Sequence, residues 1–247
     1  MQVACCLANY WMTMMQQKKL TILHFSDVLC IWAYIAQIRI DELKNKFGRQ
    51  IELQYHFIPL FGSTHIKFAE GWKNRDGFAG YNQHVLKLAE QFEHIDIHPE
   101  VWIKNIPQSS IGCHLFLKAI QILEAGEEME SLASIDTDNN LIERTLKEFR
   151  RAFFSEGVNI SEMKAQIEIA EKLNLPVAKL IDKIQSGEAY AQLDQDLQIR
   201  DKYAVKGSPT LIFNEGRQSL YGNVGYNVIE ANVHELLQHG ESQASWC

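Results

Sequence analysis

The stretch FSDVLCIWAY, residues 25–34, joins two kinds of apolar pattern around a single cysteine, Cys30. Residues 20–25 (LTILHF) are apolar with β-branched members and end at a polar pair, which predicts a buried strand. From Ile31 onward the apolar residues recur mostly at spacings of three and four, which predicts a helix. Cys30 therefore stands at a turn between a strand and a helix. Three residues later, where a redox pair would place a second cysteine, the chain has Ala33.

The following pattern completes a strand–helix–strand unit. Gly48 comes directly after the helical run and is predicted to end it. Residues 51–58 alternate apolar and polar side chains, which predicts a second strand. The helix supplies the crossover that a parallel pair requires, and the two strands are therefore predicted to be parallel.

The middle of the chain is predicted to be a block of helices. Residues 110–203 have helical periodicity throughout, with Ser161 as the predicted N-cap of one helix and Pro176 at the start of the next. The preceding residues, 62–109, are rich in Gly, His, Asn and Trp and show no clear period. We interpret them as a long connection with some helix after Gly80.

The pattern returns to β after residues 207–209 (GSP). The runs TLIF and QSLY, separated by the turn NEGR, predict a β-hairpin. A last helix is predicted with Ile229, Val233 and Leu236 on its apolar face and Gly240 at its end. The layout is thus β-α-β, a helical block and β-β-α, and the fold class is α/β.

Composition limits the classes of function. The 247 residues suffice for one large domain or two small ones, and 46% hydrophobic content is typical of a globular protein. The net charge of −7, with no basic run between aromatic residues, argues against nucleic acid as a partner, and we expect no membrane partner either. The five cysteines are scattered and lack metal-ligand spacing, which predicts neither a disulfide framework nor a zinc site and favours a reducing cytoplasm.

The first eighteen residues are apolar but lack a basic n-region, a long h-region and a clear cleavage site. We interpret residues 1–18 as a disordered extension, or as residues upstream of a start at Met14 or Met15. A weak signal peptide is the alternative.

Three stretches resemble one protein family. The first, DVLCIWAY (27–34), resembles Asp-x-x-Cys-Pro-Trp-Cys-Tyr, and VKGSPTLIFNEG (205–216) resembles Val-x-Gly-x-Pro-Thr followed by a strand and a turn. Residues 149–175 resemble a helical insertion with a Phe-Phe-x-x-Gly-x-x-Ile-Ser segment. Over about residues 19–240 the chain is similar to the DsbA-like thioredoxin-fold family, which includes FrnE-type dithiol oxidoreductases, 2-hydroxychromene-2-carboxylate isomerases and kappa-class glutathione transferases.

The resemblance implies a division of the chain. A thioredoxin-like domain with β-α-β and β-β-α halves is expected over residues 19–109 and 204–240, with a large all-helical insertion over residues 110–203. A tail is expected over residues 241–247.

The resemblance also implies roles for residues of the site. Cys30 falls on the nucleophile, Trp32 on the aromatic residue of the motif, and Pro209 on a cis-proline that faces the thiol. Two departures are equally clear, since Ile31 replaces the motif's proline and Ala33 replaces its second cysteine. A redox cycle between two cysteines of this motif is therefore excluded.

A cysteine at the start of a helix meets unpaired N–H groups and the positive end of the helix dipole, which favour the thiolate. We therefore predict a lowered pKa for Cys30 and faster alkylation than at the other four cysteines. Without a second cysteine, the mixed disulfide needs an external thiol, of which glutathione is the abundant one. The alternatives for Cys30 are a small buried hydrophobe or a degenerate, inactive site.

Other candidate residues surround the motif. Ser208 and Pro209 would offer backbone for pairing with an extended thiol ligand, unless Pro209 is an ordinary proline at the start of a strand. Trp32 would shape access to the thiol or pack as a core residue. Asp27 is expected to take part in binding the substrate or thiol. Asp27 and His24 also flank the turn as proton carriers, although a buried strand histidine satisfied by its neighbours is the favoured interpretation for His24.

The remaining cysteines and one histidine-rich segment carry weaker signals. Cys113 is expected to be a buried helix residue, with a remote resolving role as the minority hypothesis. Three cysteines near the termini are predicted to have no role: Cys5, Cys6 and Cys247. No metal is expected, because irregular spacing favours a solvated loop over a site formed by His94, His98 and Glu100.

The favoured function is a thiol–disulfide oxidoreductase that acts through Cys30 alone, in exchange with glutathione as a co-substrate and with no tightly bound cofactor. The resemblance implies a second function, a glutathione-dependent isomerase or transferase acting on a small aromatic or electrophilic substrate. Those branches commonly carry serine where this chain keeps Cys30. A third hypothesis is a non-catalytic protein that binds peptides. Expected partners are small thiols or disulfide-containing substrates, and a homodimer is left open.

Overall fold

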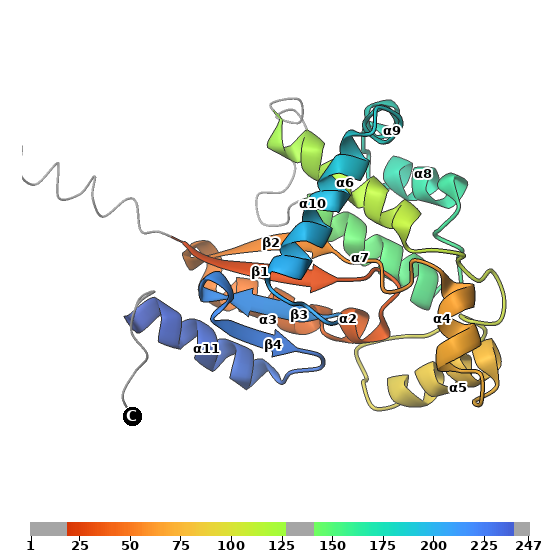
Figure 1. The fold of residues 1–247 in the computed structure, drawn as a ribbon, viewed down its shortest axis with the longest axis horizontal. Coiled ribbons are helices and arrows are strands. Elements are labelled where there is room, and N and C mark those ends of the chain that lie inside the picture. The colour runs from red at the N-terminus through yellow and green to blue at the C-terminus, as the bar shows by residue number, and fades with distance from the viewer. Residues whose placement is uncertain (1–18, 127–140, 240–247) are drawn as a thin grey trace, which may run out of the picture.

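The computed structural model describes residues 19–126 and 141–239 of the chain. Figure 1 shows the elements in chain order: β1 (Leu20–Ser26), α2 (Ile31–Ile35), α3 (Gln37–Phe47), β2 (Ile51–Phe57), α4 (Thr64–Gly71), α5 (Gly77–Ala89), α6 (Ile111–Ala125), α7 (Leu141–Phe154), α8 (Met163–Lys172), α9 (Val177–Gln185), α10 (Glu188–Lys202), β3 (Thr210–Phe213), β4 (Gln218–Tyr221) and α11 (Tyr226–His239).

The strands form one sheet in the order β2-β1-β3-β4. β1 and β2 are parallel over their full length, from the pair Leu20 and Ile51 to the pair Ser26 and Phe57. β3 is antiparallel to both β1 and β4. The predictions of a parallel βαβ unit and of a C-terminal hairpin are confirmed, as is the α/β fold class.

Alternating residues of β1 pack against different helices. Ile22 lies in a buried cluster with Ile40 of α3 and Val233 of α11, on one face of the sheet. Phe25 is buried on the other face, where Ile199 of α10 packs against the same cluster. Figure 1 shows α10 crossing the sheet on this second face. The sheet is thus covered on both faces, as expected when a strand is apolar in consecutive positions.

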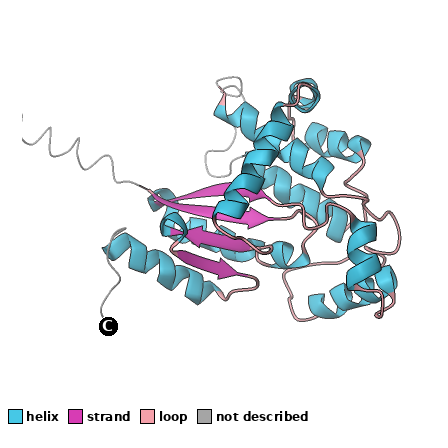
Figure 2. Cartoon of the chain, viewed as in Figure 1, coloured by secondary structure: helices cyan, strands magenta, loops and turns pink. Residues whose placement is uncertain are grey.

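The segment between β1 and α2 is embedded where the sheet meets the helical block. Val28 and Cys30 belong to the same buried cluster as Phe116 of α6 and Phe153 of α7. Figure 2 shows the helices gathered beyond the ends of β1 and β2. The turn that carries the cysteine is therefore held by residues far from it in sequence.

The connection before α6 is more helical than its composition predicts. The N-cap of α4 is Ser63, whose side chain accepts a hydrogen bond from the Ile66 amide, and α5 begins three residues before Gly80. α4 has only eight residues, and aromatic contacts such as that between Phe68 and Tyr81 stabilise it from outside the helix. The expectation of a long connection was therefore wrong for α4, because a short helix stabilised by tertiary packing has little periodicity of its own.

Two boundaries differ in detail. The N-cap of α8 is Glu162, not Ser161, because the Ser161 hydroxyl donates to Asn159. The first helix is divided at Ala36 into α2 and α3. Gly48 follows α3 with φ of 48°, as a C-terminal glycine should, whereas Gly240 lies outside the described residues.

Candidate functional site

Cys30 closes the turn between β1 and α2. Its amide donates to the Asp27 carbonyl at 3.1 Å, and its own carbonyl accepts from the amides of Ala33 and Tyr34. Cys30 has extended backbone dihedrals and is the N-cap of α2. The turn is therefore fixed by backbone hydrogen bonds on both sides of the thiol.

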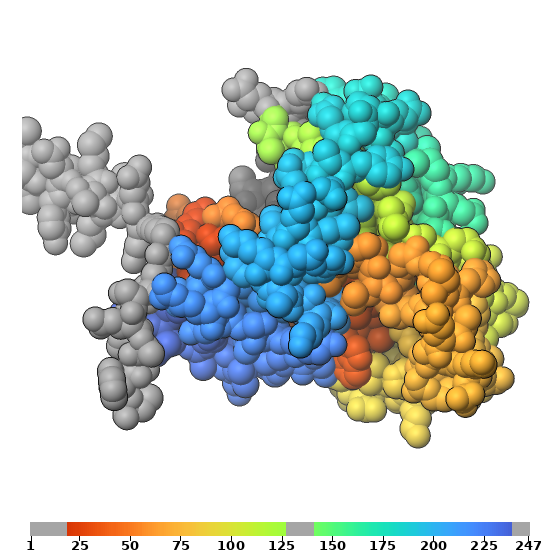
Figure 3. All heavy atoms as spheres, in the orientation of Figure 1, coloured from red at the N-terminus to blue at the C-terminus, as the bar shows by residue number. Residues whose placement is uncertain are grey.

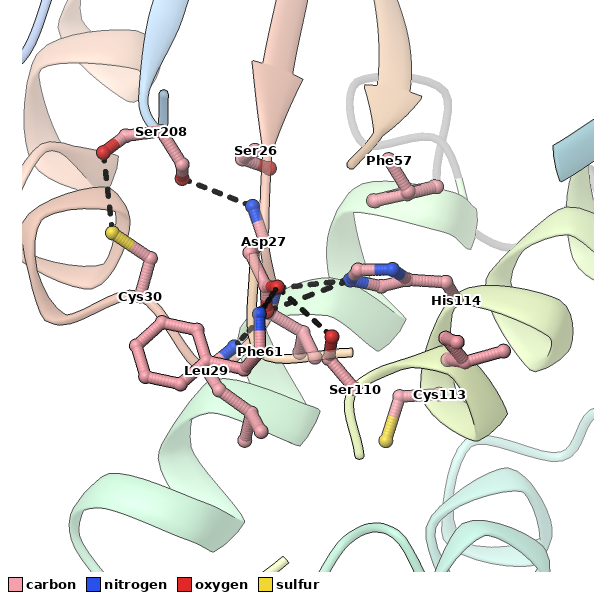
Figure 4. Close-up of polar contacts among 12 residues, drawn as sticks. Ser26, Asp27, Leu29, Cys30, Phe57, Phe61, Ser110, Cys113, His114 and Ser208 are labelled. Carbon is pink, nitrogen blue, oxygen red and sulfur yellow. Dashed lines mark hydrogen bonds and ion pairs between the residues drawn. The ribbon is translucent and has the colours of Figure 1, made fainter. Parts of the chain in front are cut away.

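The thiol lies against the loop that precedes β3. Cys30 Sγ donates to the Ser208 carbonyl at 3.2 Å, as Figure 4 shows, and the Ser208–Pro209 peptide bond is cis. The Ser208 hydroxyl accepts from the Asp27 amide at 2.9 Å. Two hydrogen bonds thus join residues about 180 positions apart in sequence, and they bring Cys30, Ser208 and Pro209 together.

The surroundings of the thiol are enclosed. Cys30 is 7% exposed, and Figure 4 places the ring of Phe61 next to it. The Lys67 ammonium lies 4.5 Å above the centre of that ring. On the face shown in Figure 3, a small red patch lies between the blue side of the molecule and the orange α4.

Burial raises the pKa of Cys30 above its ordinary value, which corrects the predicted lowering. The hydrogen bond to Ser208 and the backbone N–H groups of Ala33 and Trp32 oppose that effect, while the charge of Asp27 adds to it. The prediction failed because the start of a five-residue helix provides little dipole, and the cover over the thiol comes from elsewhere in the chain. In this structure Cys30 is a neutral thiol that donates a hydrogen bond.

Asp27 connects four segments from a fully buried position. Its Oδ1 accepts from the Leu29 amide at 2.8 Å, and its Oδ2 accepts from the Phe61 amide and the Ser110 hydroxyl, both at 2.9 Å. Its amide donates to Ser208. Asp27 was predicted to bind the substrate or thiol or to carry a proton. In the structure its carboxylate accepts hydrogen bonds from Leu29, Phe61 and Ser110 of the protein itself (Figure 4).

His114 of α6 is a site residue that the sequence did not mark. Its Nε2 accepts from the Val28 amide at 3.2 Å and lies 3.7 Å from Asp27 Oδ1, while its ring stacks on Phe57. Burial lowers the pKa of His114, so the imidazole is neutral and can accept that bond. A histidine within an apolar helix run gives no sequence signal for such a contact.

Trp32 and His24 lie on different sides of the turn. Trp32 is half-buried and contacts the ring of Phe92 edge to face, at 6.4 Å between centroids. His24 is buried among apolar residues, and burial, followed by the charge of Arg150, lowers its pKa to about 3. It lines a cavity of about 20 Å³ beside Pro209, and its Nδ1 has no hydrogen-bond partner among the described residues. His24 is therefore a buried neutral histidine rather than a proton carrier near neutral pH, although its neighbours do not satisfy Nδ1.

Cys113 is fully buried in α6 and donates to the Ile160 carbonyl at 2.8 Å. Burial raises its pKa far above the ordinary range. Figure 4 shows its thiol directed away from Cys30.

The charge of Cys30 acts on two further side chains, Tyr81 of α5 and Arg150 of α7. Tyr81 is nearly buried, and its pKa is raised by burial first and then by the charges of Cys30 and Asp27. Arg150 is completely buried. Neither was predicted, because Tyr81 lies in the connection without clear periodicity and Arg150 lies in an amphipathic helix.

No group of three or more His, Cys, Asp or Glu side chains within residues 19–126 and 141–239 could hold a metal ion. In the histidine-rich segment, His94 Nε2 lies 3.0 Å from the Ile35 carbonyl, and Glu100 pairs with Lys104. No helix in the described part of the chain is long and apolar enough to cross a membrane.

The DSBA-like thioredoxin domain matches residues 21–234 of the chain. The chain belongs to the DsbA-like family. No curated protein matches it. Solved structures with the same fold include the cytosolic disulfide reductase DsbM from Pseudomonas aeruginosa, at 18% identity and a TM-score of 0.59 over 87% of this chain and 99% of that one.

The same reductase with GSH matches at 16% identity and a TM-score of 0.61, over 87% of this chain and 100% of that one. A 2-hydroxychromene-2-carboxylate isomerase matches at 14% identity and a TM-score of 0.59, over 89% and 97% of the two chains. At these identities the likeness establishes the fold. Members of the DsbA-like family act on thiols or disulfides, and an enzyme of this general kind is what the family membership supports.

Proposed function

We propose that the protein is a thiol–disulfide oxidoreductase that uses Cys30 as its one nucleophile and an external thiol, glutathione, to complete each cycle. The observation that carries the proposal is the hydrogen bond from Cys30 Sγ to the carbonyl before the cis-proline, with Ala33 in place of a second cysteine. The same loop and turn hold the thiol in place through Ser208 and Asp27.

The cycle has two exchange steps. Cys30 first loses its proton to solvent, and the thiolate attacks the glutathione sulfur of a protein–glutathione mixed disulfide. The old S–S bond breaks, a new one forms between Cys30 and glutathione, and the released protein thiolate takes up a proton. A second glutathione thiolate then attacks the glutathione sulfur on Cys30, which releases oxidised glutathione and regenerates the Cys30 thiolate.

The chemistry of Cys30 favours the reducing direction. A thiolate of high pKa is a strong nucleophile once formed and a poor leaving group, so attack by Cys30 on the substrate disulfide is favoured and release of Cys30 from glutathione is the slower step of the cycle. Burial raises the pKa of Cys30, which is the opposite of what a strong oxidant requires. The likeness to a cytosolic disulfide reductase, including its form with GSH, supports the same direction.

Substrate has to reach a nearly buried sulfur. The Ser208 carbonyl accepts from the resting thiol, and a thiolate cannot donate that bond. Ionisation therefore frees the carbonyl before the cis-proline, which then becomes available to a backbone amide of the bound substrate. The half-buried Trp32 and the ring of Phe61 would line the approach.

The test is reduction of a glutathionylated peptide with glutathione as the reductant. Native protein and Cys113→Ser are expected to release the peptide thiol at similar rates, whereas Cys30→Ser is expected to be inactive. Full alkylation of Cys30 without loss of turnover would refute the proposal, and binding of peptide without turnover in native protein would favour the non-catalytic hypothesis.

A second candidate is conjugation or isomerisation of a small aromatic compound with glutathione. The observation in its favour is the group of rings next to the site, in which Phe61 stacks on Trp102 at 5.5 Å and contacts Tyr81 at 6.4 Å. Formation of a glutathione conjugate with 1-chloro-2,4-dinitrobenzene, by a protein that leaves mixed disulfides intact, would select this function instead.

A further inference from the structure

Tyr221 is an exposed aromatic residue that is joined to the cis-proline loop. It is the last residue of β4, the strand at one edge of the sheet, and it is 63% exposed. Its register partner in β3 is Thr210, the residue directly after Pro209. The Gly222 amide donates to the Pro209 carbonyl at 2.9 Å. The backbone at the end of β4 is therefore held by the loop whose Ser208 carbonyl contacts the thiol.

The ring of Tyr221 fills the space that a side chain at position 207 would take. A β-carbon added to Gly207 would lie 2.4 Å from Tyr221 Cε2 and 2.7 Å from its hydroxyl oxygen. The Thr210 hydroxyl donates to the Gly207 carbonyl at 2.7 Å and fixes this part of the loop. Gly207 is bonded to Ser208, whose carbonyl accepts from Cys30 Sγ at 3.2 Å. The ring thus lies against the residue next to the one that contacts the thiol.

The position of Tyr221, rather than its exposure, distinguishes it from other surface aromatic residues. Single exposed aromatic side chains are ordinary on protein surfaces, and Tyr190 of α10 is 57% exposed. Gly207 is buried, and the ring of Tyr221 is part of what covers it. The contact with Gly207 and the hydrogen bond to Pro209 place an exposed ring beside the proposed site of exchange.

A peptide substrate brings its own chain to this part of the loop. When its sulfur meets Cys30, the substrate cysteine lies beside the Ser208 carbonyl, and each further residue of an extended chain adds about 3.3 Å. A chain that continues along the loop toward Gly207 brings a residue one or two positions from its cysteine to the ring of Tyr221. Because Gly207 has no side chain, the ring is the group available for contact there. A small disulfide without flanking residues cannot make this contact.

We propose that Tyr221 is a specificity-determining residue, which binds the side chain next to the cysteine of a peptide or protein mixed disulfide and favours such substrates over small disulfides. An aromatic face binds apolar and aromatic side chains, and a tyrosine has few rotatable bonds to immobilise on binding. The preferred flanking residue is therefore apolar or aromatic. This inference rests on the proposed function, because the substrate is placed by its reaction with Cys30.

The experiment compares two substrates with glutathione as the reductant. One is a glutathionylated peptide with phenylalanine on both sides of its cysteine, and the other is the mixed disulfide of glutathione and 2-mercaptoethanol. Tyr221→Ala is expected to lower the ratio of kcat/KM for the peptide to kcat/KM for the small disulfide by about five- to tenfold, through a higher KM for the peptide. Tyr221→Phe keeps the ring and should keep the native ratio. Tyr190→Ala, which removes a similarly exposed tyrosine from α10, should also leave the ratio unchanged.

A second variant tests where the ring lies rather than whether it is present. Gly207→Ala places a methyl group 2.4 Å from Tyr221 Cε2, and the exposed end of the tyrosine side chain is the part that has to move. Gly207→Ala should therefore lower the same ratio as Tyr221→Ala does. The two changes act on one contact, so the double variant should lose no more than the larger single effect. Circular dichroism checks that each variant is folded.

An unchanged ratio in folded Tyr221→Ala, or an equal fall in Tyr190→Ala, would overturn the proposal. Binding of the fluorescently labelled phenylalanine peptide to Cys30→Ser, measured by anisotropy, needs no exchange and separates this inference from the proposed function. If the native protein reduces neither substrate, the proposed function is wrong. In that case weaker binding when Tyr221→Ala is added to Cys30→Ser would retain the role of Tyr221 in peptide recognition, and equal binding would remove it.

Discussion

Cys30 and Cys113 are both buried thiols that donate to a backbone carbonyl, and burial raises the pKa of both. They differ in the region that surrounds them. Cys113 is 0% exposed in the middle of α6, and its acceptor is the Ile160 carbonyl within the helical block. Cys30 is 7% exposed at a strand–helix turn, and its acceptor belongs to the cis-proline loop of another sheet strand. Burial alone therefore does not distinguish the proposed nucleophile from Cys113; the location of the acceptor carbonyl does.

The largest expected effect is that of removing each sulfur in turn. Cys30→Ser should reduce exchange activity with a glutathionylated peptide by at least about a hundredfold, because the thiolate is the attacking group. Cys113→Ser should retain activity within about twofold, since a serine hydroxyl can donate to the same carbonyl. Comparable loss in both variants would end the distinction between the two regions.

A second test adds a cysteine beside one of the two thiols. Ala33 is 1% exposed, and its amide donates to the Cys30 carbonyl at 3.1 Å, which is the geometry of a first helical turn. Ala33→Cys is expected to form a disulfide with Cys30 and to reduce insulin with a dithiol reductant, without glutathione for resolution. The enlarged side chain should lower the free energy of unfolding of the reduced protein by about 1–3 kcal/mol.

The controls for Ala33→Cys are the native protein and the variant that also carries Cys113→Ser. The native protein should need an external thiol in every cycle. Turnover of native protein without added thiol, lost on Cys113→Ser, would instead identify Cys113 as a resolving cysteine. A substituted protein that forms no internal disulfide would show that the turn is not shaped for a Cys-x-x-Cys motif.

The parts of the fold that the sequence predicted are those determined by local patterns. The alternation and apolar runs of β1 and β2, the glycine after α3 and the hairpin of β3 and β4 depend on residues within a few positions of one another. α4 depends instead on rings contributed by α5 and by the segment around Trp102, and no local pattern reports such contacts.

The same division explains the candidate site. The positions of Cys30 and Pro209 could be predicted from short motifs, whereas the direction of the pKa shift could not, because the thiol is buried against a loop about 180 positions away in sequence. Arg150 did leave a signal, since it lies four residues after Leu146 and three before Phe153, within the buried stripe of α7. A charged residue in an apolar stripe indicates a buried cation.

A smaller difference is expected in how the two thiols respond to pH. Cys30 should be alkylated about tenfold faster than Cys113, because it is not fully enclosed, and both rates should still be rising above the ordinary thiol pKa of 9.0. The same raised pKa values determine how stability depends on pH. Above pH 9.0 the thiols of the unfolded chain lose protons that the folded thiols keep, so the free energy of unfolding falls as pH rises. Limited labelling at about pH 8 and urea unfolding between about pH 8 and pH 10 measure both effects. Faster labelling of Cys113 would contradict the comparison.

The smallest expected effect concerns the acceptor of Cys30 rather than its sulfur. Ser208→Ala removes the hydroxyl that accepts from the Asp27 amide, which should lower the free energy of unfolding by about 1–3 kcal/mol. It should also change the labelling rate of Cys30 by about two- to threefold, because the carbonyl that holds the thiol loses its anchor to the turn. The matched control is Ser110→Ala, which removes a donor from the same Asp27 but does not contact the thiol loop. If Ser110→Ala alters Cys30 labelling as much as Ser208→Ala does, general loosening around Asp27 controls the thiol, and the hydrogen bond to the cis-proline loop has no separate role in distinguishing Cys30 from Cys113.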